Sequence, residues 1–193
     1  MSDRPGPIPV VIRDATPEDM AAVQAIYAFY VERTAHSFEE APPSVEEMRR
    51  RRDDIVGRGY PYLVAEEDGE ILGYCYVRPF RERTAYRYTI EDSIYVAPFV
   101  TGRGIGKALV SAMIERCTAM GYRQMIAVIG DSANAGSIAL HRSLGFRQEG
   151  VLRGVGFKFG RWVDVVIMHR TLANDSRPLP DGADAPPLPG YDG

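Results

Sequence analysis

The spacing of apolar residues divides the first half of the chain into two helices and four strands. One helix starts at Thr16-Pro17, and a second starts at the capping box that begins with Ser44. The apolar face of the first helix is formed by Met20, Val23, Ile26, Tyr27 and Tyr30. Strands are expected over residues 10–15, 60–66, 70–78 and 86–96. Asp68-Gly69 predicts a tight hairpin between the middle two strands.

The second half of the chain also shows apolar residues at helical and at strand spacing. Apolar residues recur at helical spacing after a glycine-rich segment, until Gly121 ends that helix. A buried strand, a short helix closed by Gly145 and two further strands are expected over residues 124–129, 134–144, 146–152 and 157–171. The resulting order is a strand, two helices, three strands, a helix, a strand, a helix and two strands, which combines helices and strands in one α/β domain.

The two ends of the chain differ in composition from the segment between them. Residues 1–9 and 173–193 are rich in proline and glycine, and we expect both to be disordered. Residues 10–172 then form one domain, since 193 residues are enough for a single well-packed core.

The charge of the chain argues against a nucleic-acid or membrane partner. The formal net charge of −3 is small and acidic, and acidic residues flank the one basic run, at 49–52, on both sides. A solvated helix face explains that run better than a DNA contact does. No window of the sequence approaches a membrane-spanning length, and the N-terminus lacks the apolar segment of a signal peptide. We therefore expect a cytoplasmic protein.

The most informative segment, residues 94–109, reads as a strand, a glycine-rich turn and the start of a helix. The first turn of a helix has unpaired amides and partial positive charge, which together favour a bound phosphate. Three glycines within residues 102–106 let such a group approach the backbone closely, and Arg103 and Lys107 add two cations. The pattern predicts a phosphate site, with an ordinary glycine turn as the structural alternative.

The spacing separates this turn from two common nucleotide loops. A Walker A loop is excluded because Thr101 stands at its first glycine and Ala108 replaces its hydroxyl. A dinucleotide fingerprint is disfavoured because Lys107 stands at its third glycine.

The turn instead resembles the pyrophosphate loop of the GNAT superfamily of N-acetyltransferases, whose signature is Gln or Arg, two residues, Gly, one residue, then Gly or Ala. Thr101 is the one departure, and it leaves the backbone cradle intact. The order of elements over residues 10–172 is also that of the superfamily. The resemblance implies the GNAT fold, a twisted mixed sheet of about seven strands with helices on both faces, and acetyl-CoA as co-substrate. The coenzyme residues that it implies in this stretch are Ile94, Tyr95, Val96, Thr101, Gly102, Arg103, Gly104, Ile105, Gly106 and Lys107.

A second segment resembles the closing motif of the superfamily, in which an Asn is followed at fixed spacing by a Tyr and then by Gly-Phe or Gly-Tyr. Asn134 opens this segment here, and His141 takes the Tyr position. Asn134, Ser137 and His141 share one helix face, which in the family borders the coenzyme. Asn134 and Ser137 thereby join the expected coenzyme residues.

The histidine narrows the resemblance within the superfamily. Leu140-His141 is similar to the phosphinothricin-type and methionine-sulfone-type amino-acid acetyltransferases, as are residues 78–80, 89–96 and 157–162. The implied activity is transfer of the acetyl group of acetyl-CoA to the amine of a small amino acid or analogue, such as phosphinothricin, methionine sulfone or methionine sulfoximine. A homodimer is expected by analogy with the family alone.

Acetyl transfer needs a neutral amine, a polarised carbonyl and a proton for the leaving thiol. By resemblance, Glu91 is the general base, directly or through a water, and the amide of Val96 or a neighbour polarises the carbonyl. His141 hydrogen-bonds or protonates the departing sulfur. Direct transfer is expected, because Cys75 lies in a strand that looks buried and is a poor nucleophile. The structural alternatives are a solvated strand face for Glu91 and a satisfied core position for His141.

The acceptor amine needs a pocket of its own. By resemblance to the Arg-Pro-Phe segment of the family, Arg78 is the expected partner of an amino-acid carboxylate, with a surface charge as its alternative. Tyr27, Phe38 and Phe80 are expected in the pocket wall, although such aromatic residues are often simply core. No metal is expected, because Cys75 and the other cysteine lack metal-ligand spacing.

Two further classes of function stay open at this point. A protein N-terminal or polyamine acetyltransferase would use the same coenzyme site with an open peptide groove or an acidic pocket. A non-catalytic sensor would bind acetyl-CoA without transferring its acetyl group.

Overall fold

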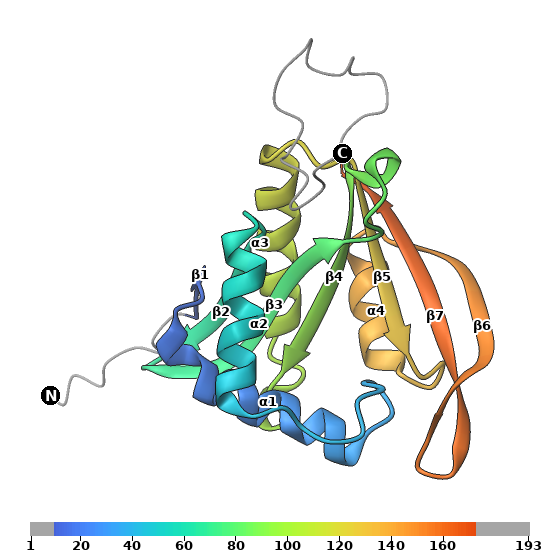
Figure 1. Cartoon of the computed structure of the whole chain (residues 1–193), viewed down its shortest axis with the longest axis horizontal. Helices are drawn as coiled ribbons and strands as arrows, with labels where there is room; N and C mark the ends of the chain where they lie inside the picture. The colour runs from blue at the N-terminus through green and yellow to red at the C-terminus, as the bar shows by residue number, and fades with distance from the viewer. Residues whose placement is uncertain (1–9, 173–193) are drawn as a thin grey trace, which may run out of the picture.

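The computed structural model of the chain describes residues 10–172, and the two segments expected to be disordered lie outside that range. Seven strands form one sheet in the order β1-β2-β3-β4-β5-β7-β6 (Figure 1). The strands are β1 (Val11–Asp14), β2 (Tyr62–Glu67), β3 (Glu70–Pro79), β4 (Thr89–Val96), β5 (Gln124–Gly130), β6 (Arg147–Lys158) and β7 (Arg161–Thr171). The helices are α1 (Met20–Arg33), α2 (Val45–Gly57), α3 (Ile105–Ala119) and α4 (Ala135–Ser143).

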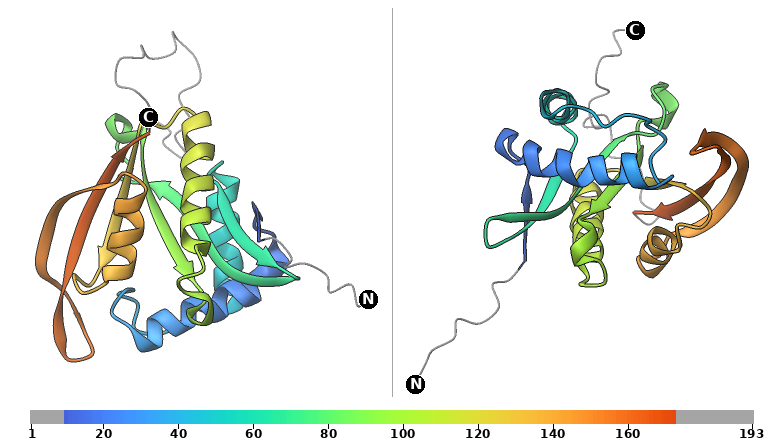
Figure 2. Two further views of the ribbon diagram at one scale, coloured as in Figure 1. Left: turned by 180° about the vertical axis from the view of Figure 1, so that it is seen from behind. Right: turned by 90° about the horizontal axis from the view of Figure 1, so that it is seen from below.

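Helices cover both faces of the sheet. The helices α1 and α2 lie on one face, and α3 and α4 lie on the other, as the front and back views show (Figure 1, Figure 2). Neighbouring strands are antiparallel except for the central pair β4 and β5, which is parallel. The predicted α/β fold with a mixed, seven-stranded sheet is therefore confirmed.

The capping residues start the first two helices as predicted. A single 3-10 turn at Pro17–Asp19 leads into α1, and the Asp19 carboxylate accepts the Thr16 amide at 2.7 Å. Arg13 donates to the same carboxylate through two nitrogens, at 2.7 and 2.8 Å, which ties the helix start to β1. At α2 the Ser44 hydroxyl accepts the Glu47 amide at 3.1 Å.

Two predicted strand boundaries are wrong. The strand expected from residue 86 begins at Thr89, because residues 84–86 form a 3-10 turn. The last hairpin turns at Phe159-Gly160, with φ of 51° and 72°, and not within residues 153–156. The glycines before it are absorbed as a register irregularity inside β6, and a positive φ at phenylalanine is too rare for the sequence to signal the true turn.

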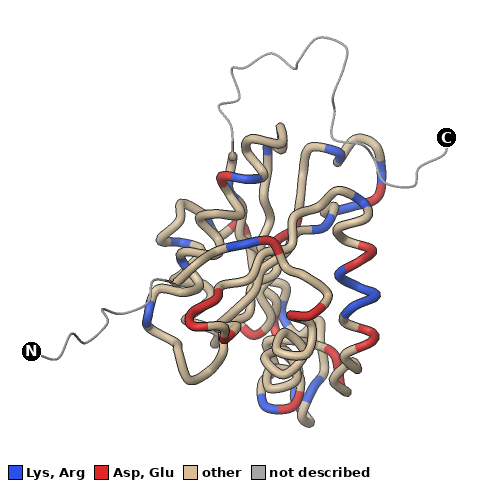
Figure 3. Tube along the Cα trace, turned by 90° about the vertical axis from the view of Figure 1, so that its left-hand side faces the viewer, with Lys and Arg blue, Asp and Glu red and all other residues tan. Residues whose placement is uncertain are grey.

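The basic run of α2 lies between acidic residues (Figure 3) and is paired with some of them. Glu47 forms ion pairs with Arg50 and Arg51, one and two positions into the run, and Arg52 pairs with Asp53. These pairs fit the solvated helix face inferred from the sequence. No helix within residues 10–172 is both long enough and apolar enough to cross a membrane.

Candidate active site

The sheet opens between its two central strands. The strands β4 and β5 pair from Thr89 to Asp92 against Gln124 to Ala127, and their pairing ends there. Beyond this point β4 stays paired with β3, and β5 stays paired with β7, so the two halves of the sheet separate. We call this opening, between residues 93–96 and 128–130, the fork.

A cleft of about 700 Å³ lies at the fork, between the start of α3 and the start of α4. All of the predicted coenzyme residues except Arg103 line it. Arg103 instead donates to both carboxylate oxygens of Glu67 on β2, at 2.6 and 2.8 Å. The residues brought together in the cleft are Ile94, Tyr95, Val96, Thr101, Gly102, Gly104, Ile105, Gly106, Lys107, Asn134 and Ser137.

The glycine-rich turn presents bare backbone to this cleft. Gly102 and Gly104 both have a φ of 82°, and a Cβ added to either would meet open space. The first amide that bonds back within α3 is that of Ala108, which donates to the Gly104 carbonyl at 3.0 Å. The amides of residues 105–107 have no partner among residues 10–172. A helix start with three free amides fits a diphosphate group.

The backbone of β4 forms the opposite wall of the cleft. The Ala97 amide donates to Leu72 on the β3 side at 2.8 Å. Because amides alternate in direction along a strand, the Val96 amide points the other way, into the fork. The Val96 carbonyl accepts the Tyr30 hydroxyl at 2.6 Å, which anchors this strand end to α1.

The helix α4 begins at the edge of the cleft and is capped by Asn134, whose side-chain oxygen accepts the Ser137 amide at 3.2 Å. One turn further on, His141 is 1% exposed. Its Nδ1 lies 2.8 Å from the Ser137 carbonyl oxygen and 3.4 Å from the Ser137 hydroxyl oxygen. The histidine therefore lines the cleft as an almost fully buried side chain whose Nδ1 faces Ser137.

The other ring nitrogen of His141 is held from β4. Its Nε2 lies 3.0 Å from Oδ2 of Asp92, which is 5% exposed. Burial alone would lower the pKa of His141, but the hydrogen bond and charge of Asp92, together with the Ser137 carbonyl, outweigh it and raise that pKa above its ordinary value. The sequence analysis missed Asp92, although its place next to Glu91 in an alternating strand put it on the face of α4.

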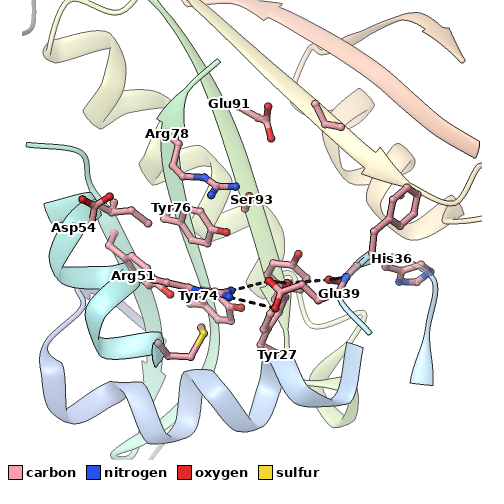
Figure 4. Close-up of a pocket in the computed structure, with 18 of the residues that line it drawn as sticks. Tyr27, His36, Glu39, Arg51, Asp54, Tyr74, Tyr76, Arg78, Glu91 and Ser93 are labelled. Carbon is pink, nitrogen blue, oxygen red and sulfur yellow. Dashed lines mark hydrogen bonds and ion pairs between the residues drawn. The ribbon is translucent and has the colours of Figure 1, made fainter. Parts of the chain in front are cut away.

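A second cavity, of about 610 Å³, lies on the α1 and α2 face of the sheet (Figure 4). We call it the acceptor pocket. Four of the predicted substrate residues line it, namely Tyr27, Phe38, Arg78 and Glu91. The fifth, Phe80, lies outside the lining and packs edge-to-face against Tyr86. Because the pocket and the cleft share lining residues on β4 and β5, including Ser93 and Val128, they adjoin at the fork.

Tyrosine side chains form the floor of the acceptor pocket. Tyr74 and Tyr76 alternate with buried residues along β3, and both stack on Tyr62 of β2, with ring centroids 5.8 and 5.1 Å away. Sequence reasoning missed all three, although Tyr74, Tyr76 and Arg78 follow one another at the two-residue spacing of a strand face. This spacing could have identified them.

Arg78 and Glu91 are cross-strand neighbours at the upper end of the pocket (Figure 4). Burial raises the pKa of Glu91, and the nearby charge of Arg78 offsets only part of this effect. Arg78 forms no ion pair with any residue of 10–172, and its guanidinium lies 5.6 Å from the centre of the Tyr76 ring. The pocket thus has a half-buried carboxyl group beside an arginine that lacks a carboxylate partner.

The other arginine of the pocket is neutralised by neighbours. Arg51 donates to Glu39 at 2.7 and 3.3 Å and to Glu47 at 2.8 Å. Glu39 also accepts the Tyr27 hydroxyl at 2.9 Å, so this network joins α1, α2 and the loop between them. Arg78 is therefore the arginine of the pocket that is available to an anionic ligand.

The thiol of Cys75 belongs to the core. Cys75 is 1% exposed, its thiol donates to the Leu109 carbonyl at 3.6 Å, and burial raises its pKa well above the ordinary value. A thiol in this state is a poor nucleophile. Within residues 10–172, no three His, Cys, Asp and Glu side chains are grouped so that they could hold a metal ion.

Comparison with known proteins places this arrangement among named enzymes. The chain is 49% identical to a phosphinothricin N-acetyltransferase from Alcaligenes faecalis over 171 residues, which cover 89% of this chain and 85% of the relative. It is 41% identical to an L-methionine sulfoximine/L-methionine sulfone acetyltransferase from Pseudomonas aeruginosa, over 83% of this chain and 94% of the relative.

A solved structure shows the same fold with a ligand. The phosphinothricin acetyltransferase of Sinorhizobium meliloti, crystallised in complex with AcCoA, superposes with a TM-score of 0.85 at 47% identity, covering 90% of this chain and 94% of that one. The sequence model of a protein family, the acetyltransferase (GNAT) domain, matches residues 12–167, which span every element from β1 into β7. The fork, the free amides and this match lead to one conclusion: the chain belongs to the GNAT acetyltransferase family.

Proposed function

We propose that this acetyltransferase moves the acetyl group of acetyl-CoA to the α-amine of a free amino acid with a polar, oxidised side chain, of the phosphinothricin, methionine sulfone or methionine sulfoximine type. The observation that carries the proposal is that Arg78 and Glu91 lie side by side on neighbouring strands, in a tyrosine-lined pocket that adjoins the fork. An α-amino acid offers a carboxylate and an amine on one carbon, which suits an arginine and a carboxyl group on neighbouring strands.

The coenzyme site is proposed in the cleft. Acetyl-CoA supplies an acetyl thioester, which is already activated toward attack by an amine. The free amides of residues 105–107, with Lys107 beside them, hold the diphosphate. Asn134 and Ser137 border the arm of the coenzyme from α4, and Ile94 and Tyr95 border it from β4. The Val96 amide, which points into the fork, polarises the acetyl carbonyl.

Glu91 is proposed as the general base, directly or through a water. A Lys-like amine, with a pKa of about 10.4, is largely charged at neutral pH, and the α-amine of a free amino acid lies between that value and the value of about 7.8 for a peptide. Deprotonation therefore has to be assisted. The raised pKa of Glu91 brings this carboxyl group closer to the pKa of its amine partner, which favours proton transfer.

His141 is proposed to serve the departing thiol from the other face of β4. Direct transfer is the mechanism that these residues support, because the buried thiol of Cys75 cannot form an acetylated intermediate without leaving the core. Alignment of the two reactants can then supply much of the rate, since aligned partners reach effective molarities of about 10⁵ M or more.

A homodimer in the cytoplasm completes the proposal. Large apolar side chains cluster on the β6–β7 hairpin, where Phe157, Phe159 and Trp162 are 58, 60 and 69% exposed. Exposed aromatic groups of this size favour a protein contact, and a second copy of the chain is the simplest occupant. Neither a nucleic-acid partner nor a membrane partner is part of the proposal.

The experiment is a panel of amines with acetyl-CoA, followed by detection of the free thiol. We expect turnover with L-methionine sulfone, L-methionine sulfoximine and phosphinothricin, and much less with spermidine or an N-terminal peptide, because an unpaired arginine in the pocket repels a polyamine. Preference for spermidine or the peptide would favour the corresponding alternative. Binding of CoA without turnover of any amine would instead identify a sensor.

A further inference from the structure

His141 has two hydrogen-bond partners that together fix its protons. A carbonyl oxygen can only accept, so the contact of 2.8 Å with the Ser137 carbonyl requires a proton on Nδ1. Nε2 faces a carboxylate oxygen of Asp92 at 3.0 Å, and that contact requires a second proton between the two groups. The buried pair therefore holds two protons, and it is neutral when the histidine is an imidazolium and Asp92 is a carboxylate.

The environment of Asp92 supports this assignment. Its Oδ1 is the one fully buried side-chain oxygen or nitrogen within residues 10–172 that has no hydrogen-bond partner. An unpaired buried oxygen destabilises the folded state, so a second interaction has to compensate. Of the titratable neighbours, Cys75 on β3 and Cys117 on α3 are thiols whose pKa is raised, and Glu91 lies on the opposite face of β4. His141 is the neighbour that contacts Asp92 and that carries a compensating positive charge when it is protonated.

Asp92, His141 and Ser137 contact one another in series, and Ser137 is the most exposed of the three. The Nδ1 proton of His141 faces two oxygens of one residue, the Ser137 carbonyl at 2.8 Å and the Ser137 hydroxyl at 3.4 Å. Asp92, Ser137 and His141 all line the cleft, but Ser137 is half-buried whereas His141 and Asp92 are almost fully buried. Because Nε2 is held by Asp92, the Nδ1 proton is the one that can leave, and the hydroxyl that it faces is that of Ser137.

We propose that Asp92, His141 and Ser137 form a proton relay from the vertex of the fork to the cleft, and that it delivers the proton required by the leaving thiolate. This proposal rests on the proposed function and assigns two residues that the sequence analysis did not link to proton transfer. Asp92 is a positioning residue, because it holds His141 oriented and doubly protonated. Ser137 is the group that faces the coenzyme.

The proton movements balance. The Ser137 hydroxyl gives its proton to the thiolate and takes the Nδ1 proton of His141. His141 is then a neutral imidazole that keeps its Nε2 proton toward Asp92. A proton from solvent, entering by way of Ser137, restores the imidazolium after the products leave. No bond between the acetyl group and the protein is formed.

The first test needs neither substrate nor turnover. The chain has three histidines, so ¹⁵N spectra of the imidazole nitrogens can be assigned with a single His141→Gln variant. We expect both nitrogens of His141 to be predominantly protonated at pH 6.5 in the free enzyme. A neutral ring at this pH would overturn the relay, whatever the variants below do.

The second test removes the charge and keeps the shape of Asp92. In Asp92→Asn, the side-chain oxygen still accepts from Nε2, but we expect the His141 titration to move down by about one pH unit or more, since an opposite charge is lost from a buried site. The alkaline limb of kcat should move down with it. An unchanged titration, or an alkaline limb that stays in place, would refute the role of Asp92.

The third test separates Ser137 from a helix-stabilising role. We expect Ser137→Ala to lower kcat about tenfold or more while the KM for acetyl-CoA and the His141 titration change little. Ser143→Ala is the matched control, because Ser143 is an exposed serine of the same helix that bonds to the Leu140 carbonyl at 2.7 Å. Equal kcat in the two variants would remove Ser137 from the relay. Failure of the amine panel would instead defeat the proposed function and leave the titration result standing.

Discussion

The cleft and the acceptor pocket lie on opposite sides of the same strand and are built by different means. The cleft presents backbone groups: free amides at the start of α3, a strand amide and glycines that leave the surface bare. The pocket is lined by residues of β2, β3, β4, β5, β7, α1, α2 and the loop before α2, most of them through their side chains. A backbone site suits a ligand common to a whole family, whereas a side-chain site can be altered one residue at a time.

The strand β4 connects the two sites through its alternation. Glu91 faces the acceptor pocket and Asp92 faces α4, so two neighbouring carboxyl groups act in separate places. Their surroundings differ accordingly. Glu91 has no hydrogen-bond partner among residues 10–172 and is free to meet an amine, while Asp92 is bound to His141.

The largest effect is expected where the pocket meets the fork. Glu91→Gln should lower kcat about 10²- to 10⁴-fold, the usual contribution of a general base, and leave the affinity for CoA unchanged. Steady-state kinetics and calorimetry measure the two quantities. Glu70→Gln, at an exposed position of β3, is the control. Unchanged turnover in Glu91→Gln would remove this carboxyl group from the mechanism.

The next largest effect is expected in the acceptor pocket and depends on the carboxylate of the amine substrate. Arg78→Gln should lower kcat/KM for L-methionine sulfone about ten- to a hundredfold, the value of a charge-assisted hydrogen bond, and barely change it for the same amine without its carboxylate. Arg81→Gln is the control, since Arg81 stacks on Phe80 outside the pocket. An equal loss for both amines would show that Arg78 does not bind the carboxylate.

A smaller effect is expected in the cleft. Gly104→Val should weaken CoA binding about tenfold, because a φ of 82° costs a residue with a side chain about 1–2 kcal/mol and the new side chain stands in the open space before the amides. The KM for the amine should change little. Gly57→Ala, at the end of α2, is the matched glycine control. Unchanged calorimetric affinity in Gly104→Val would contradict a diphosphate site here.

The smallest effect concerns stability. Because the pKa of folded Glu91 is raised above 4.5, its contribution to stability is present below that pH and is lost as the pH rises through the folded pKa. Glu91→Gln should therefore be more stable than the wild type near pH 7 and equal to it below pH 4.5. Urea unfolding at several pH values measures this difference. A variant that is less stable at pH 7 would contradict the burial of an unpaired carboxyl group.

The contrast between the two sites also explains what could be predicted from the sequence. Glycine spacing indicates a backbone site directly, since Gly102 and Gly104 have a positive φ, whereas the individual coenzyme residues were expected from the family resemblance. Helix starts at Thr16 and Ser44 were readable for the same reason, because a cap is a local interaction.

The acceptor pocket and the Asp92–His141 pair depend on contacts between distant segments. Tyr62 and Tyr76 meet only through the β2–β3 register, and Asp92 meets His141 across 49 residues. Arg103 was expected over the phosphates, but its bond to Glu67 depends on how β2 lies beside the glycine-rich turn. Local patterns carry no information about such partners.

A crystal structure of the complex with CoA and L-methionine sulfone tests the account most directly. We expect the diphosphate on the amides of residues 105–107, the amino-acid carboxylate on Arg78, and the amine within hydrogen-bond reach of Glu91 or one water away. A diphosphate bound elsewhere, or an amino acid whose amine lies far from Glu91, would contradict the claim that the cleft binds the coenzyme and the acceptor pocket binds the amine.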